Sequence, residues 1–172
     1  MKIVCSGIAM LVLCAAPASI VGSGLSRTFS TRALAQTGST PATAGPVVRH
    51  KAPSDRALDV SLDALRAEFA DMKAQKRITT RLLEGGEYSV NARYLAGPES
   101  PQIHKSIIEL YFVQEGSGTL VTGGTIVDTA IRGGVERVVK AGDVIFIPPG
   151  VPHGFTRTTG VAYLNVHFGG TD

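Results

Sequence analysis

From Arg77 onward the sequence consists of short segments with alternating apolar residues, separated by glycine-containing turns such as Gly123-Gly124. Strands of about four to eight residues at this spacing are typical of an all-β sandwich or barrel. No regular alternation of strands with helices is present, which argues against the α/β folds that bind nucleotides. The predicted strands are Ile78–Leu83, Tyr88–Leu95, Glu109–Gln114, Thr119–Thr122, Thr125–Val127, Glu136–Val139, Val144–Ile147, Gly154–Thr156 and Val161–Phe168.

One amphipathic helix is predicted before this region, over residues 59–76. Asp59 or Ser61 is suited to cap its N-terminus. A single amphipathic helix cannot bury its own apolar face, so we expect it to pack on the outside of the strands that follow. The apolar stripe, at helical spacing, consists of Leu62, Leu65, Phe69 and Met72.

The first 35 residues have the pattern of an export signal. Lys2 is followed by an apolar stretch that is strongest from Ile8 to Ala16, and Ala33-Leu34-Ala35 fits a small-x-small cleavage site. Cleavage after Ala35 predicts a periplasmic or secreted protein. Ala16-Pro17-Ala18 is a second candidate cleavage site, and an uncleaved membrane anchor is the alternative.

Between the signal and the helix, residues 36–58 are predicted to be a flexible tether. Gln36 to Pro53 is rich in Pro, Gly, Ser and Thr. Both cysteines, Cys5 and Cys14, precede the predicted cleavage site, so the mature chain is expected to have no disulfide and no thiol chemistry.

The charge balance argues against nucleic acid and anionic lipid as partners. The chain has 17 Lys and Arg against 14 Asp and Glu, and three of the basic residues, Lys2, Arg27 and Arg32, lie in the signal. The remainder is electrically balanced, so it offers no basic surface for nucleic acid or anionic lipid. We therefore expect a small-molecule ligand or substrate, no nucleic acid, and membrane contact only if the signal is uncleaved.

Two histidines and one glutamate are the candidate metal ligands. His104 precedes a predicted strand that begins with Glu109, and His153 follows the rigid Pro148–Pro152 loop. Imidazole and carboxylate together suit first-row divalent metals. Spacing alone also allows the two histidines to be unrelated.

The longer pattern resembles the cupin family. Gly97–Gly116 resembles the first cupin motif, G-x5-H-x-H-x3-4-E-x6-G, and Gly142–His153 matches the spacing of the second, G-x5-P-x-G-x2-H-x3-N. The resemblance implies a double-stranded β-helix, a jelly-roll barrel, over residues 77–172. It also implies one metal ion inside the barrel, held by three His and one Glu.

The resemblance carries over His104, Glu109 and His153 as metal ligands. The other motif histidine is replaced by Gln102, which becomes the fourth candidate ligand, and the final motif asparagine is replaced by Arg157. Gln102 and His104 are two residues apart and so share one side of a strand. The predicted cofactor is one divalent ion, Cu, Fe, Mn or Zn, and a cupin that has lost its metal is the alternative.

Strand alternation supplies further pocket candidates. Tyr111 shares a face with Glu109 and is a candidate substrate contact, and Tyr163, Asn165 and His167 share a face of the last strand. If this face points inward, Tyr163 and His167 are candidate catalytic groups; if outward, they are solvent-exposed. Arg157 is either a substrate clamp on the same face as His153 or an exposed rim residue.

Three functions are compatible with these observations. The first is an exported, metal-dependent oxidoreductase of the dioxygenase type that acts on a small organic molecule. The second is a metal-dependent isomerase or lyase, and the third is a non-catalytic protein that binds a metal or small ligand. A homodimer is a further expectation, because cupins often associate through sheet edges and N-terminal extensions.

Overall fold

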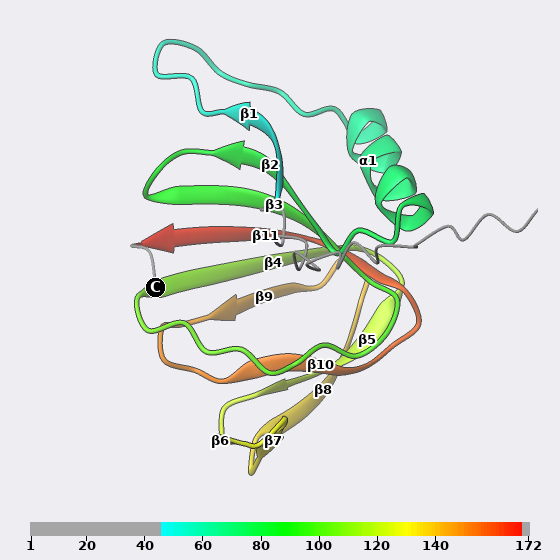
Figure 1. Cartoon of the computed structure of the whole chain (residues 1–172), viewed down its shortest axis with the longest axis vertical. Coiled ribbons are helices and arrows are strands. Elements are labelled where there is room, and N and C mark those ends of the chain that lie inside the picture. Colours follow the sequence, from blue (N-terminus) through cyan, green and yellow to red (C-terminus); the bar gives the residue numbers. More distant parts are fainter. Residues whose placement is uncertain (1–45, 170–172) are drawn as a thin grey trace, which may run out of the picture. The chain divides into compact units, whose positions relative to one another are not determined.

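The computed structural model describes residues 46–169, which form a curved β-structure with one helix on its outer side (Figure 1). The predicted signal, both cysteines and residues 36–45 of the predicted tether lie outside the described residues. The helix α1 (Leu62–Ala74) begins after Ser61, whose side-chain oxygen accepts a hydrogen bond from the Ala64 amide at 3.2 Å. Nothing helical among the described residues has the length and apolar character needed to cross a membrane.

Two sheets face each other and enclose the core. The larger sheet has the strand order β1-β2-β3-β11-β4-β9, so the last strand lies between β3 and β4, and all neighbours except β1 and β2 are antiparallel. Its strands are β1 (Val47–Lys51), β2 (Thr79–Glu84), β3 (Tyr88–Leu95), β4 (Ile107–Glu115), β9 (Val144–Ile147) and β11 (Val161–Gly169). The second sheet contains β5 (Ser117–Thr122), β8 (Val135–Lys140) and β10 (His153–Thr158), and a small hairpin contains β6 (Thr125–Val127) and β7 (Ala130–Arg132).

This architecture confirms the predicted fold class, an all-β barrel preceded by one helix. Every strand predicted from the sequence has a counterpart, with ends shifted by up to two residues. The prediction missed β7, because a three-residue strand is too short to show an alternating pattern.

The core inside the barrel comes from side chains on the facing surfaces of the two sheets. Tyr111 and Tyr163, from the adjacent strands β4 and β11, have ring centroids 4.7 Å apart, and Phe155 of β10 packs against Tyr163 at 5.5 Å. These aromatic rings fill the barrel interior next to His153, the first residue of β10. Further buried members of this core are Leu95, Val113, Leu120, Val139, Ile145, Ile147 and Val161.

A second apolar cluster lies on the outer face of the larger sheet, where α1 packs. Leu65, Phe69 and Met72 of the helix contact Leu82, Ala92 and Ala162 of the sheet. The prediction that the helix packs outside the barrel is therefore confirmed, although Leu62 of the predicted stripe remains 55% exposed.

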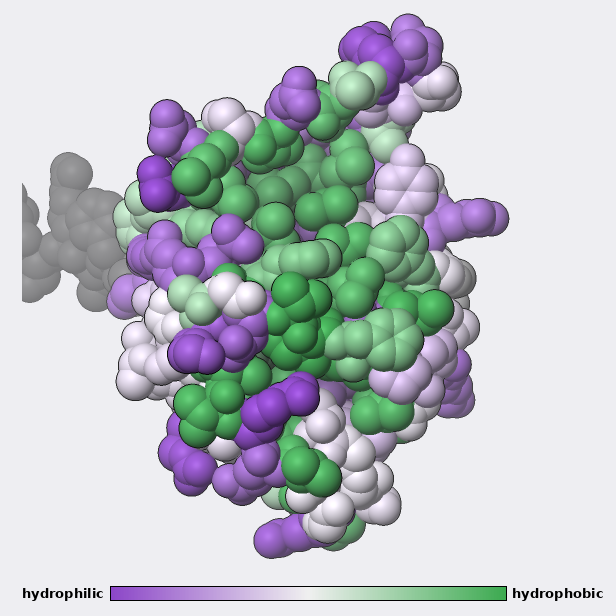
Figure 2. Space-filling view, turned by 180° about the vertical axis from the view of Figure 1, so that it is seen from behind, coloured by the Kyte–Doolittle hydropathy of each residue, from purple (hydrophilic) through white to green (hydrophobic). Residues whose placement is uncertain are grey.

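The helix covers only part of the outer surface. Figure 2 shows a broad group of apolar side chains on the side of the molecule opposite to the view of Figure 1. Among the exposed apolar residues are Val144 and Phe146 of β9 and Phe168 of β11. Strand alternation directs these side chains away from Ile145, Ile147 and the barrel interior.

The structure corrects the prediction of a flexible tether over residues 47–51. These residues form β1, which pairs in parallel with β2, and the Ala52 amide continues the pairing to the Glu84 carbonyl at 2.8 Å. All five residues of β1 are exposed. The strand is held by backbone hydrogen bonds rather than by burial, so the sequence shows no apolar pattern that would reveal it.

Ion pairs connect the helix with β1 and with the chain that leads into β2. Glu68 of the helix accepts hydrogen bonds from Arg49 at 2.8 Å and from Arg77 at 3.1 Å. Burial opposes ionisation of Glu68, but the hydrogen bonds from Arg49, Thr80 and Arg77 outweigh it and lower the pKa of this carboxyl. The ionised carboxylate therefore ties three parts of the chain together.

Replacing Glu68 with glutamine should lower the free energy of unfolding at pH 7 by about 1–3 kcal/mol, because two charge-assisted hydrogen bonds are weakened. The folded-state pKa is below the ordinary 4.5, so this contribution is present above that pH and is lost as the pH falls. Denaturant unfolding of the unchanged protein and of Glu68→Gln should thus show a difference in the free energy of unfolding that becomes smaller below pH 4.5. The control is Asp63→Asn, on the same helix at a side chain that is 94% exposed; an equal loss there would contradict the prediction.

Candidate metal centre

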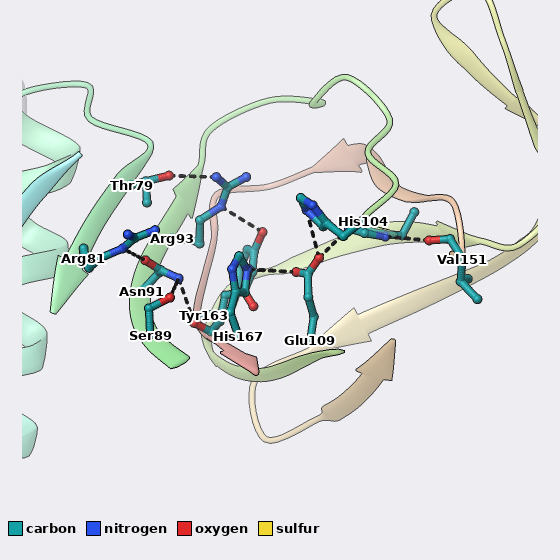
Figure 3. Close-up of polar contacts among 12 residues, drawn as sticks. Thr79, Arg81, Ser89, Asn91, Arg93, His104, Glu109, Val151, Tyr163 and His167 are labelled. Carbon is teal, nitrogen blue, oxygen red and sulfur yellow. Dashed lines mark hydrogen bonds and ion pairs between the residues drawn. The ribbon is translucent and has the colours of Figure 1, made fainter. Parts of the chain in front are cut away.

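Three side chains from distant parts of the sequence meet inside the barrel: His104, Glu109 and His153. His104 lies in the segment leading into β4, Glu109 is in β4, and His153 is the first residue of β10. The Nε2 atom of His104 lies 3.2 Å from Oε1 of Glu109 (Figure 3). The Nε2 atom of His153 lies 3.1 Å from the same oxygen. One ligand atom from each residue lies within 4.8 Å of the others, so the group could hold one metal ion.

Two of these atoms, Oε1 of Glu109 and Nε2 of His153, are buried and have no hydrogen-bond partner within the described chain. Buried polar atoms are nearly always paired, so both need a partner that the chain does not supply. Two ligand atoms bonded to one cation at about 2.1 Å lie about 3.0 Å apart at right angles and about 3.4 Å apart in a tetrahedron. The observed separations of 3.1 and 3.2 Å fall in this range. The residues present therefore fit a divalent metal ion.

The orientation of His153 also suits a ligand. Its Nδ1 lies 2.9 Å from the carbonyl oxygen of Val151, in the proline-rich loop. An N–H on Nδ1 donates to this carbonyl, which leaves the lone pair of Nε2 directed at Glu109 when the ring is neutral. The loop thereby fixes both the tautomer and the direction of the ring.

Glu109 is held as a carboxylate although only 1% of its side chain is exposed. Burial by itself raises the pKa of Glu109, but the imidazoles of His153 and His167 outweigh this and hold it well below its usual range. Burial likewise lowers the pKa of His153, and Glu109 reverses this and raises it. The site thus supplies one full negative charge to a cation.

The last strand, β11, presents its polar face to this site. Asn165 donates through Nδ2 to Oε2 of Glu109 at 2.9 Å, and Nε2 of His167 lies 3.4 Å from the same oxygen (Figure 3). His167 stands directly opposite Glu109 in the strand register. The sequence left open whether this face of β11 points inward or outward, and the structure shows that it points inward. Asn165 holds Oε2, so that Oε1 faces His104 and His153.

Asn165→Leu should weaken metal binding about 10- to 100-fold, the usual cost of losing an outer partner of a ligand. The substitution keeps the side-chain volume and removes the donor to Glu109. Metal affinity can be measured by competition with a chromophoric chelator. The matched control is Asn91→Leu, because Asn91 is equally buried and lies opposite Asn165 in β3 but donates to Ser89 and to the Asn165 backbone. Equal losses in both variants would contradict the prediction.

Gln102, the fourth predicted ligand, lies beside the site. Its backbone exchanges two hydrogen bonds with His153, of 2.8 and 2.9 Å. Residues directly opposite in an antiparallel pair project their side chains to the same face, so Gln102 emerges on the face of His153. Its role as a ligand stays a prediction.

The two tyrosines predicted near the site are both buried in the barrel. Tyr111 stands with its ring 6.3 Å from that of His153, and the Tyr163 hydroxyl accepts a hydrogen bond from Nε of Arg93 at 3.4 Å. Burial raises the pKa of Tyr163, so the phenol stays protonated at neutral pH. The catalytic roles predicted for Tyr163 and His167, and the substrate contact predicted for Tyr111, stay predictions.

The prediction that Arg157 shares a face with His153 is wrong. A bulge between Phe155 and Arg157 shifts the pairing of β10 with β5 by one residue, so the side-chain alternation reverses. Arg157 is 71% exposed and pairs with Glu136 of β8 at 3.1 Å. It therefore lies on the outer side of the barrel wall, away from the metal ligands.

Sequence reasoning missed a group of polar side chains on the inner face of β2 and β3. Arg81 donates to Asn91 at 3.1 Å and to Glu84 at 2.6 Å, while Arg93 pairs with Glu99 at 2.6 Å. The alternation of the two predicted strands placed these arginines on one side of each strand, but nothing in the pattern showed that this side faces the barrel interior.

The sequence and structure were compared with known proteins. Residues 92–167 match the family model described as a cupin domain. A protein from Bacillus halodurans is 17% identical with a TM-score of 0.52, covering 69% of this chain and 86% of that one. An RmlC-like cupin with a double-stranded β-helix fold from Methanocaldococcus jannaschii is 14% identical, covering 54% and 79%, with a TM-score of 0.42. No curated protein matches the sequence.

Proposed function

Because this chain belongs to the cupin superfamily, we propose that it is a mononuclear metal-dependent oxidoreductase of the dioxygenase type. Its substrate in this proposal is a small organic molecule that reaches the metal inside the barrel. The observation that carries the proposal is the cluster of His104, Glu109 and His153, with ligand atoms 3.1 and 3.2 Å apart around one carboxylate oxygen.

Ligand chemistry supports this choice. Two histidines and one carboxylate that leave coordination positions open are the ligand set of non-haem ferrous oxygenases. One anionic ligand leaves a divalent ion with a net charge of +1, which favours an anionic substrate beside it. The bound metal would supply the electron transfer with dioxygen that no side chain of the chain provides.

The residues of the chain have separate tasks in this proposal. His104, Glu109 and His153 hold the ion, and Asn165 fixes the carboxylate of Glu109. The buried ring of Tyr111 packs behind His153 and excludes water from that side. This arrangement keeps the ligands rigid. It leaves a substrate free to approach the metal from the side of the polar residues on β2 and β3.

A test without a known substrate uses nitric oxide as a probe for an open position on ferrous ion. We expect the anaerobically iron-loaded protein to give the paramagnetic resonance signal of a ferrous nitrosyl, and His153→Ala to give none. His50→Ala is the control, because His50 lies exposed on β1. Loading without a signal contradicts the oxygenase proposal and favours the isomerase or lyase; failure to bind any of the four metals favours the non-catalytic binder.

We also propose that the protein is exported and processed after Ala35. The support is the apolar stretch after Lys2 and the small residues at Ala33 and Ala35. N-terminal sequencing of protein recovered from the periplasm or the medium should begin at Gln36. Recovery of full-length chain in the membrane fraction would contradict cleavage.

A further inference from the structure

A cavity of about 540 Å³ opens between β3 and the segment 96–102. This volume lies within the range of about 300–1,000 Å³ that is usual for small-molecule sites. We call it the Arg93 cavity. Its lining includes Ile78, Arg93, Leu95, Pro98, Glu99 and Gln102.

The polar part of the Arg93 cavity is a partly buried ion pair. Nη2 of Arg93 lies 2.6 Å from Oε2 of Glu99, and the two side chains are only 15% and 11% exposed. Arg93 also donates through Nη1 to Thr79 at 2.7 Å and through Nε to the Tyr163 hydroxyl (Figure 3). These three bonds use three of the five N–H donors of a guanidinium, so two donors remain for a ligand.

The apolar lining of the cavity indicates that the part of the ligand away from its charged group is apolar. Ile78, Leu95 and Pro98 line the same space as Arg93, and Ile78 is 56% exposed at the edge. Binding of a hydrocarbon or aromatic group here removes apolar surface from water, which lowers the free energy of the complex. A guanidinium with free donors next to an apolar wall recognises a carboxylate attached to an apolar body.

The cavity adjoins the metal centre through Gln102. This residue lines the cavity, its backbone pairs with that of His153, and its side chain projects to the same face as His153. Charge favours the same ligand. Arg93 and Glu99 cancel each other, whereas a divalent ion with Glu109 retains one positive charge, so a monoanion balances the whole site.

We propose that the Arg93 cavity is the substrate site and that it takes a small monocarboxylate with an apolar body, anchored on Arg93 and directed past Gln102 toward the metal. This inference deepens the proposed function and rests on it for the reaction. The anchoring itself does not require the metal, so it can fail or hold independently.

The other polar opening near the centre fits this ligand less well. It is lined by Arg81, Ser89 and His167 and has a volume of only about 100 Å³, below the range of small-molecule sites. Two carboxylates, Glu84 and Glu87, line this opening, whereas the Arg93 cavity has one, Glu99, so an anion meets more negative charge here.

The probes are benzoate and benzamide, which have the same shape and differ in charge. Calorimetric titration of the metal-loaded full chain should show benzoate binding about 10- to 100-fold more tightly than benzamide. The double variant Arg93→Met/Glu99→Gln removes both charges together, so that no isolated buried charge remains. It should lose the part of the preference for benzoate that Arg93 supplies, at least about tenfold in relative affinity. Arg157→Met/Glu136→Gln, which removes the ion pair on the outer side of the wall, should keep the preference for benzoate.

The remaining outcomes separate this inference from the proposed function. An Arg93-dependent preference in a protein that binds none of the four candidate metals would support the cavity and contradict the metal-dependent oxidoreductase. Metal binding with equal affinity for both probes, or with no affinity for either, would overturn the cavity assignment. If the double variant does not fold, Ala96→Trp at the edge of the cavity provides the test, since it should weaken benzoate binding at least about tenfold, and unchanged binding would also overturn the assignment.

Discussion

His153→Ala and His104→Ala should each lose the metal ion. Loss of an outer partner costs about 10- to 100-fold in affinity, so loss of a direct ligand should cost more than about 100-fold. The reason is geometric: the cluster of His104, Glu109 and His153 offers one ligand atom from each residue to a single ion, so each variant removes one of the three. Elemental analysis of dialysed protein should fall from about one metal per chain to near zero.

Further variants should change metal binding by different amounts. Gln102→Ala should have a smaller effect than either histidine variant, and Gln102→His should strengthen binding by adding an imidazole on the face of His153. His50→Ala should leave metal content unchanged. Because His153 is only 1% exposed and its truncation leaves a cavity, His153→Gln serves as a second variant of closer volume. Full metal retention in folded variants of both His104 and His153 would show that the site has been assigned wrongly.

Chelation should lower the thermal midpoint of the metal-loaded protein by about 8–20 °C. An ion present at a thousand times its dissociation constant stabilises the fold by about 4 kcal/mol, and each kcal/mol shifts the midpoint of a domain of this size by about 2–5 °C. Removal of the ion leaves Oε1 of Glu109 and Nε2 of His153 buried without a partner. Scanning calorimetry with and without chelator measures the difference.

This metal-dependent shift should grow with pH between 6 and 8. In the metal-free protein, burial lowers the pKa of His153 but Glu109 outweighs it, so the pKa lies above the ordinary 6.5. The protonated imidazole stabilises the metal-free fold at low pH, and that contribution is lost as the pH rises through the folded-state pKa. The ion needs the neutral imidazole, so its affinity rises over the same interval. A shift that is constant across this range, or one that persists in His153→Ala, would contradict the assignment.

The comparison of sequence and structure shows where local pattern is sufficient. The strand Tyr88–Leu95, the cap at Ser61 and the buried stripe of α1 follow from residues that are neighbours in the chain. The cluster of His104, Glu109 and His153 could also be anticipated, because the resemblance to the two cupin motifs, with their glycines and prolines at fixed spacing, marked these residues as candidate ligands. Gly116, at the end of the first motif, has φ +69° and an added Cβ would lie 2.0 Å from the Gly160 carbonyl oxygen, so the motif requires glycine there.

Other features depended on contacts that no local pattern encodes. The strand β1 forms on the edge of β2 without burying a side chain, and the bulge in β10 turns Arg157 outward. Asn165 is 56 residues from the carboxylate that it holds. Glu99 meets Arg93 only because the segment 96–102 leaves β3 and forms backbone hydrogen bonds with β10.

By itself the sequence determined which side chains share a face of a regular strand such as β11, where most turns occur and which residues carry ligand chemistry, because each of these depends on backbone geometry over a few residues. Only the tertiary structure decided which face of β11 and β3 points inward, since both faces of these strands are acceptable until the sheet curves and α1 covers one of them. That closure directs Asn165 and His167 to Glu109 and creates the Arg93 cavity beside the candidate metal centre.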